Sequence, residues 1–125
     1  MGKFVMKKSG SGYTFNLKAT NGEIIAVSGE VLSTLAICKN SIESVRKNAP
    51  IAAVEDQTVE GYAVEQHPKF EIYLDKAGEY RFRLKAKNGE PILASEGYTA
   101  KASCKNGIES VRKNAVDAEV IEPKA

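Results

Sequence analysis

The sequence predicts an α+β domain in which one β3-α-β unit occurs twice. The first observation is that CKNSIESVRKNA at 38–49 returns as CKNGIESVRKNA at 104–115, with eleven of twelve positions identical. The second is that YTFNLKATNG at 13–22 returns as YRFRLKAKNG at 80–89, with seven of ten identical. The third is a period-two apolar pattern followed by a helical one in each copy. A duplication this close predicts two copies of one structural unit.

Each copy is expected to open with two strands joined by a glycine-containing turn. Phe4 and Met6 alternate in the first strand of copy one, and Phe70, Ile72 and Leu74 do so in copy two. The turns are Ser9–Gly12 and Asp75–Gly78. The second strands then show clean period-two patterns that put one apolar set on a single face. These sets are Tyr13, Phe15, Leu17 and Ala19, and Tyr80, Phe82, Leu84 and Ala86.

Asn-Gly pairs at 21–22 and 88–89 predict tight hairpins of type I′, with both central residues at positive φ. The third strands are expected at Glu23–Ser28 and Glu90–Ser95. A two-residue turn aligns Lys18 with Ile25, Asn16 with Val27, Lys85 with Ile92 and Arg83 with Ala94.

A helix is predicted after the third strand of each copy. Ser33 or Thr34 is expected to cap the first helix and Thr99 the second. Pro50 ends the first helix by Asn48. Glu43–Lys47 and Glu109–Lys113 have the spacing of favourable i,i+4 ion pairs. The apolar stripes are Leu35, Cys38, Ile42, Val45 and Ala49, and Ala100, Cys104, Ile108, Val111 and Ala115.

The two copies are expected to form one pseudo-symmetric domain over residues 1–125. A unit of about 50–60 residues buries only about 60% of its unfolded surface, so two such units gain by sharing a core. Repeat one is placed at 2–56, an acidic linker at 57–68 and repeat two at 69–122. Short closing strands are expected at Ile51–Val54 and Ala118–Ile121. Both helices should cover one face of a single antiparallel sheet, since each apolar strand face needs a cover.

Composition excludes some classes of protein. A hydrophobic content of 42% with 27% charged residues is typical of a globular domain, and a net charge of +2 does not by itself predict a nucleic-acid or membrane partner. No apolar run approaches the ~20 residues of a membrane span. We therefore expect a cytoplasmic monomer with an internal pseudo-dimer, and free, buried thiols at Cys38 and Cys104.

The chain resembles the YegP-like proteins, a family found mainly in bacteria. The resemblance is carried by YRFRLKAKNGE at 80–90, SEGYT at 95–99 and GIESV at 107–111, and the first repeat departs from the pattern around 29–37 and at Ser41. It implies one continuous sheet built from β3-α-β units, present as tandem repeats or as two subunits, with exchanged closing strands. It implies no activity.

Enzymatic chemistry is not expected. The single histidine, His67, precedes Pro68 in the linker, where no packed wall would orient its ring. Cys38 and Cys104 lie on apolar stripes without a histidine nearby in the sequence, and two cysteines with one histidine do not make a zinc site. No catalytic residue, metal or cofactor is predicted.

A basic stripe is the first candidate site. Arg81, Arg83, Lys85 and Lys87 alternate with the apolar residues of their strand, so they should lie on the sheet face away from the helices. With Tyr73 as a stacking platform they could follow a phosphate backbone. The alternative is a solvated strand with cross-strand partners at Glu71 and Glu90.

The same face is expected to carry apolar anchors at Tyr73, Ile92, Ile25 and Val27, next to Val5. A mixed apolar and basic surface is typical of protein contacts, although scattered apolar residues on a solvated face are also normal. The leading interpretation is a small non-enzymatic interaction module that uses this face to bind a protein partner. The alternative is a nucleic-acid accessory protein that uses the basic stripe. We also expect that a small residue at Gly107 permits close approach of a helix to a helix or to the sheet.

Overall fold

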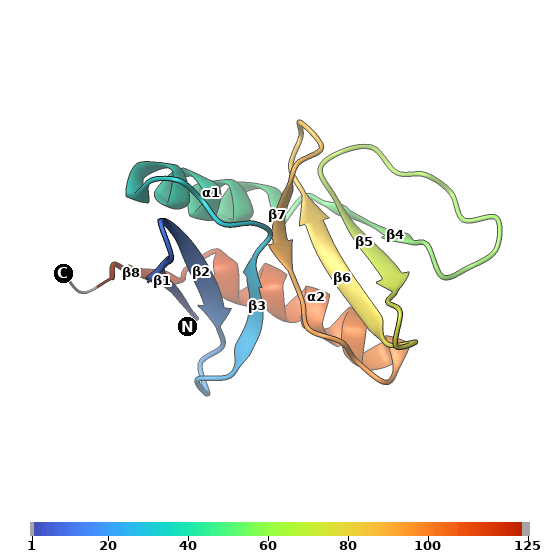
Figure 1. Ribbon diagram of the computed structural model, residues 1–125. Helices are drawn as coiled ribbons and strands as arrows, with labels where there is room; N and C mark the ends of the chain where they lie inside the picture. The colour runs from blue at the N-terminus through green and yellow to red at the C-terminus, as the bar shows by residue number, and fades with distance from the viewer. Residues whose placement is uncertain (1, 124–125) are drawn as a thin grey trace.

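The computed structural model describes residues 2–123, so residues 1 and 124–125 of the expected domain lie outside it. Eight strands form one sheet in the order β4-β5-β6-β7-β3-β2-β1-β8, and both helices lie on one side of it (Figure 1). The elements are β1 (Lys3–Ser9), β2 (Gly12–Lys18), β3 (Ile24–Ser28), α1 (Leu35–Asn48), β4 (Ala53–Asp56), β5 (Lys69–Leu74), β6 (Tyr80–Lys85), β7 (Pro91–Ala94), α2 (Lys101–Ala115) and β8 (Glu119–Ile121).

The closing strands are exchanged between the repeats. β4 ends repeat one but pairs with β5 of repeat two, while β8 ends repeat two and pairs with β1. These two edge pairs are parallel, so the sheet is mixed and the expectation of a wholly antiparallel sheet is wrong in this detail. The reason is that β3 and β7, which are equivalent strands, pair antiparallel at the centre. This reverses the second repeat, so each closing strand runs in the same direction as the strand it joins.

The core lies between the helices and the facing side of the sheet. Phe4 and Phe15 meet edge to face at 5.8 Å, and the equivalent Phe70 and Phe82 do so at 6.0 Å. The predicted helix stripes are buried against them except at their first residues, half-buried Leu35 and exposed Ala100. The buried part includes Cys38 and Cys104, which are free thiols. Both copies of the apolar pattern therefore serve one shared core.

The hairpin turns differ from the type I′ geometry. Gly22 and Gly89 have φ of 87° and 85°, but no described residue other than glycine has a positive φ. Instead, the Gly22 N–H donates to the Ala19 carbonyl, and the Glu23 N–H donates to Asn21 Oδ1. This side-chain bond satisfies a backbone N–H without a positive φ at the asparagine.

The longer turn shifts the register of the strands that follow it. Lys18 pairs with Ile24, not with Ile25, and Lys85 pairs with Pro91, not with Ile92. The Asn16–Val27 and Arg83–Ala94 pairs are as predicted, because each shift occurs between the last two residues of the preceding strand.

The helix starts differ between the copies. Thr34 caps α1, its hydroxyl accepting from the Ile37 N–H at 3.1 Å. Ala100 occupies the equivalent place in α2, which has no side-chain cap. The expected cap at Thr99 is wrong because Thr99 corresponds to Ser33.

The duplicated twelve-residue segment ties the two repeats together. Arg46 Nη1 donates to the carbonyls of Ala115, the last residue of α2, and of Val116 and Ala118 just beyond it. Arg112 donates in return to the carbonyls of Ala49 and Ala52 beyond α1. Each guanidinium also lies over a core ring, Phe4 or Phe70. Since each arginine satisfies the carbonyl end of the other helix, the segment is explained as a reciprocal structural clamp.

Gly107 marks a close approach of α2 to the sheet. A Cβ placed there would lie 2.6 Å from the Tyr98 hydroxyl and 3.0 Å from the Phe82 ring. Ser41 stands at the equivalent place in α1, where Leu32 replaces Tyr98 in the bridge to the second strand. Because leucine has no hydroxyl, the Tyr98 hydroxyl that would meet a Cβ at 107 has no counterpart in repeat one. The expected close approach is thus present, between helix and sheet.

Candidate functional site

The sheet face away from the helices, called the open face below, carries one row of residues across all eight strands. These residues alternate with core residues in their strands and pair with one another in register. In sheet order the row is Glu55, Glu71, Arg83, Ala94, Val27, Asn16, Val5 and Ile121. In the second half of the sheet (β4, β5, β6, β7) it is ionic on β4, β5 and β6 and has Ala94 on β7. In the first half (β3, β2, β1, β8) it is mainly apolar.

An ionic cluster fills the second half of the open face. Lys69 Nζ lies 2.7 Å from Glu55 Oε1 and 3.4 Å from Glu71 Oε2. Arg83 Nε lies 2.6 Å from Glu71 Oε1, and Lys85 Nζ lies 3.4 Å from the same oxygen. Lys69, Glu55 and Glu71 are only 5%, 2% and 3% exposed. We call Glu55, Lys69, Glu71, Arg83 and Lys85 the ionic cluster.

The 57–68 loop covers part of this cluster. The loop projects outward beside β4 and β5 (Figure 1), yet the Glu65 N–H donates to Glu55 Oε1 at 2.8 Å. Gln57 Nε2 donates to the other Glu55 oxygen at 2.6 Å. Burial alone would raise the pKa of Glu55, but the hydrogen bonds from Gln57, Lys69 and Glu65 with the Lys69 charge lower it to about 2. Glu55 is therefore an ionised structural anchor for the loop.

The predicted basic stripe is largely neutralised within the chain. Arg81 Nε pairs with Asp75 at 2.6 Å, a contact that lowers the pKa of the Asp75 carboxyl. Arg83 and Lys85 pair with Glu71, as the cross-strand alternative predicted, and Arg83 lies 4.3 Å above the Tyr73 ring.

Lys87 is separated from the other three cations. It lies beyond the end of β6, in the turn, where it borders a depression of about 370 Å³ with Ser44, Lys47 and Asn48 of α1. The four predicted cations therefore do not form one continuous stripe.

The apolar part of the prediction is shifted along the sheet. Val27 is 41% exposed, in keeping with an anchor, but Ile25 and Ile92 are each 8% exposed. Their expected exposure is wrong because the register shift places Ile24, which is 48% exposed, opposite Lys18. Val5 and Ile121, both half-buried, extend the surface to the edge strand. A position-by-position comparison of the repeats could have predicted that the apolar surface includes Val5, since Val5 stands where repeat two has Glu71.

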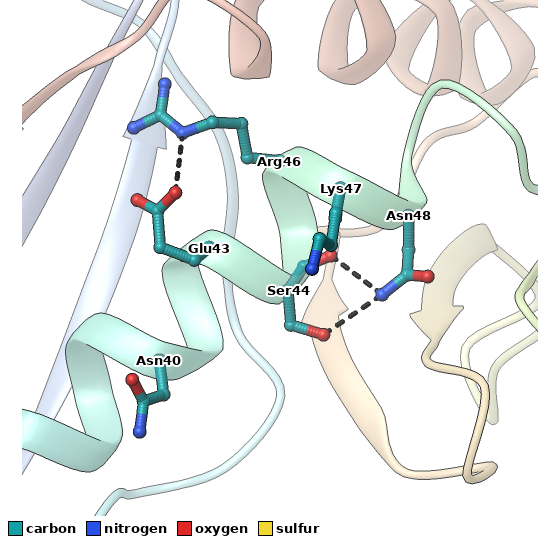
Figure 2. Close-up of a pocket in the computed structure, with 6 residues that line it drawn as sticks. All are labelled: Asn40, Glu43, Ser44, Arg46, Lys47 and Asn48. Atoms are coloured by element: carbon teal, nitrogen blue, oxygen red, sulfur yellow. Dashed lines mark hydrogen bonds and ion pairs between the residues drawn. The ribbon is translucent and has the colours of Figure 1, made fainter.

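A depression of about 530 Å³ on α1 is a second candidate. It is lined by polar residues of one helix, and its groups largely satisfy one another (Figure 2). Arg46 Nε lies 3.3 Å from Glu43 Oε1, and Asn48 Nδ2 donates to the Ser44 carbonyl and hydroxyl. The observed Glu43–Arg46 pair replaces the predicted Glu43–Lys47 pair, and Glu109–Arg112 replaces Glu109–Lys113. This depression belongs to the clamp between the repeats.

The chemistry of the thiols does not favour a nucleophilic role. Burial raises the pKa of Cys104 to about 11 and also raises that of Cys38. His67 is exposed on the loop. Within residues 2–123, no group of three or more His, Cys, Asp or Glu side chains is placed to hold a metal ion, and neither helix is long and apolar enough to cross a membrane.

Comparison with known proteins agrees with this structure. A model for a domain of unknown function, DUF1508, matches residues 9–56 and again 75–122. The UPF0339 protein YegP of Yersinia pestis is 38% identical over 117 residues, which cover 93% of this chain and 90% of that protein. A UPF0339 protein of Treponema denticola is 65% identical over 54 residues, 43% of this chain and 93% of the relative, which therefore corresponds to one repeat.

Further matches cover one repeat or the whole fold. A UPF0339 protein from a ptx operon region of Stutzerimonas stutzeri is 68% identical over 56 residues, 45% of this chain and half of that relative. The solution structure of yegP from E. coli, a protein of unknown function, has a TM-score of 0.79 at 30% identity, covering 99% of this chain and 95% of that one. The chain thus belongs to the DUF1508 family and carries two tandem copies of its domain, in a family whose biochemical function is unassigned.

Proposed function

We propose that this chain is a small, non-enzymatic, cytoplasmic interaction module, monomeric, that binds a protein partner through the first half of its open face. One observation carries the proposal. The row across the sheet changes from buried ion pairs at Glu55, Glu71 and Arg83 to partly exposed apolar side chains at Val27, Val5 and Ile121. In the second half the charged side chains of the row are paired within the chain. In the first half the apolar side chains stay partly exposed.

The central strand supplies the exposed part of this surface. Ile24 and Val27 lie on β3, with Ala94 of β7 beside Val27. Burying an exposed valine or isoleucine contributes about 1.5–3 kcal/mol at full burial, so a few such side chains suffice to anchor a partner. A hollow of about 240 Å³ on this strand, lined by Ile24, Ile25 and Val27 among others, gives the surface relief.

A nucleic-acid role on the basic stripe is the weaker candidate. Arg81, Arg83 and Lys85 are each bonded to a carboxylate of the chain, and a phosphate would have to compete with Asp75 or Glu71. Affinity for nucleic acid would fall steeply with salt, whereas apolar anchoring would not.

The test is capture of partners from the cell lysate of the source organism with three forms of the tagged chain, each with and without nuclease. These are the wild type, V27D and V59D. Val59 is 49% exposed on the loop, so its substitution is a control of similar exposure away from the face.

We expect a protein that survives nuclease to be retained by wild type and V59D and lost with V27D. Partners that disappear on nuclease treatment would overturn the proposal in favour of the basic stripe. Loss with V59D alone would move the contact to the loop.

A further inference from the structure

We propose that Lys3 and Lys18 hold the carboxylate of an acidic side chain from an extended protein segment, seated over Val5 and Asn16. The inference rests on the proposed function and names the chemistry of its partner. The two lysines would add a carboxylate-binding site to the apolar surface of the first half.

The second half of the sheet supplies the template for this site. There Lys69 pairs in register with Lys85, and Glu71 with Arg83. The Glu71 carboxylate lies between the three cations, at 2.6 Å from Arg83 Nε and 3.4 Å from each lysine Nζ. The chain therefore shows how this backbone holds a carboxylate.

The first half repeats the frame without the carboxylate. Lys3 pairs in register with Lys18, and Val5 with Asn16. Val5 thus stands in the place of Glu71, and Asn16 in the place of Arg83. Two lysines directly opposite on one face repel each other unless an anion lies between them. In the described part of the chain neither lysine forms an ion pair, although Glu119 stands opposite Lys3 on the edge strand.

Asn16 is the second, independent observation. It is 7% exposed and lies on the open face between Val5 and Val27. Its side-chain amide has no hydrogen-bond partner among residues 2–123. No side-chain nitrogen or oxygen atom of residues 2–123 is both buried and unpaired, so the Asn16 amide still reaches solvent, and its NH₂ group is open to donate to a ligand oxygen.

The surroundings indicate a protein carboxylate. The row next to the two lysines contains Val5, Val27 and Ile121, which suit apolar side chains. A polyanion would need cations along its length. An extended segment places every second side chain on one face, so an acidic residue with apolar residues two positions before and after it fits the row.

The test is an NMR titration of the ¹⁵N-labelled full chain with N-acetyl-Val-Thr-Glu-Thr-Val-amide, and with the matched peptide that has Gln in place of Glu. We expect saturating shifts at Lys3 and Lys18 and at the Asn16 side-chain amide with the Glu peptide. Affinity should be about tenfold weaker for the Gln peptide and for the K18Q variant, the loss of one charge-assisted hydrogen bond. K85Q, the same change in the second half, should bind as the wild type does.

Three results would overturn the inference. Equal binding of both peptides near Val5 and Val27 would leave the proposed interaction face intact but remove its carboxylate site. No shift at these residues with either peptide would reject the site, while the V27D capture experiment would still decide the proposed function. Tighter binding of a short oligothymidylate at the same lysines would assign the site to a polyanion.

Discussion

Equivalent strands in the two halves of the sheet carry mostly the same core side chains, whereas the row of residues across the open face differs. Phe4 and Phe15 pack as Phe70 and Phe82 do. On the open face, in contrast, Ile121, Val5 and Asn16 replace Glu55, Glu71 and Arg83. The difference teaches that duplication preserved what both repeats need in order to fold together. The outer face differs, with an ionic cluster in one half and partly exposed apolar side chains in the other.

The largest effect should come from the pair Lys69 and Lys3, which occupy the same place in β5 and β1. K69M leaves Glu55 and Glu71 buried without their shared cation and should cost about 3–5 kcal/mol of unfolding free energy. K3M removes an exposed charge and should change stability by no more than about 0.5 kcal/mol. Urea denaturation of both variants measures the two losses of unfolding free energy. Equal losses would mean that Lys69 is no more important to stability than Lys3, contrary to the contrast between the halves.

The reciprocal arginines should show what the halves share. R46M and R112M each remove charge-assisted bonds to the carbonyls beyond the other helix, and each should cost about 2–3 kcal/mol. Because the contacts are equivalent, the two losses should agree within about 1 kcal/mol. Thermal unfolding is a suitable measurement, and a large loss for one with none for the other would refute a mutual clamp.

Gly107 and Tyr98 of repeat two correspond to Ser41 and Leu32 of repeat one, and we expect each pair of residues to be matched in size. G107S, which introduces the residue of the first repeat, should cost about 1–3 kcal/mol because its Cβ meets Tyr98 and Phe82. Y98L, which introduces the matching leucine, should reduce that cost by about 1 kcal/mol in the double variant. Purely additive free energies would show that Tyr98 does not set the limit at this position.

The helix starts should give the smallest effect. T34A removes the α1 cap and should cost about 1 kcal/mol, whereas A100T supplies the missing cap to α2 and should gain up to about 1 kcal/mol. Chemical denaturation of T34A, A100T and the wild type measures these differences in unfolding free energy. A neutral A100T would show that the α2 start is already satisfied by other means.

The core and the exchange of closing strands could be predicted because they depend on apolar periodicity, on the duplication and on the family resemblance. The turn type could not, since Asn21 satisfies a backbone N–H with its own side chain instead of taking a positive φ. The resulting register shift buried Ile25 and exposed Ile24.

The pairing of Arg81 and Arg83 depended on where Asp75 and Glu71 point. The burial of Glu55 depended on a loop ten residues away in the chain, which no local pattern encodes. The contrast between Val5 and Glu71 was visible in the sequence and needed only an aligned comparison of the repeats.

The claim that the two halves share one frame and differ by a carboxylate is tested most directly by replacing Val5 with glutamate, the residue at the equivalent position 71. In V5E the introduced side chain should lie between Lys3 and Lys18, as Glu71 lies between Lys69 and Lys85. An NMR titration should then give it a pKa below the usual ~4.3 of glutamate, because nearby cations favour the charged form. V5E should also be at least as stable as the V5Q control at pH 7. A normal or raised pKa, with V5E less stable than V5Q, would contradict the account.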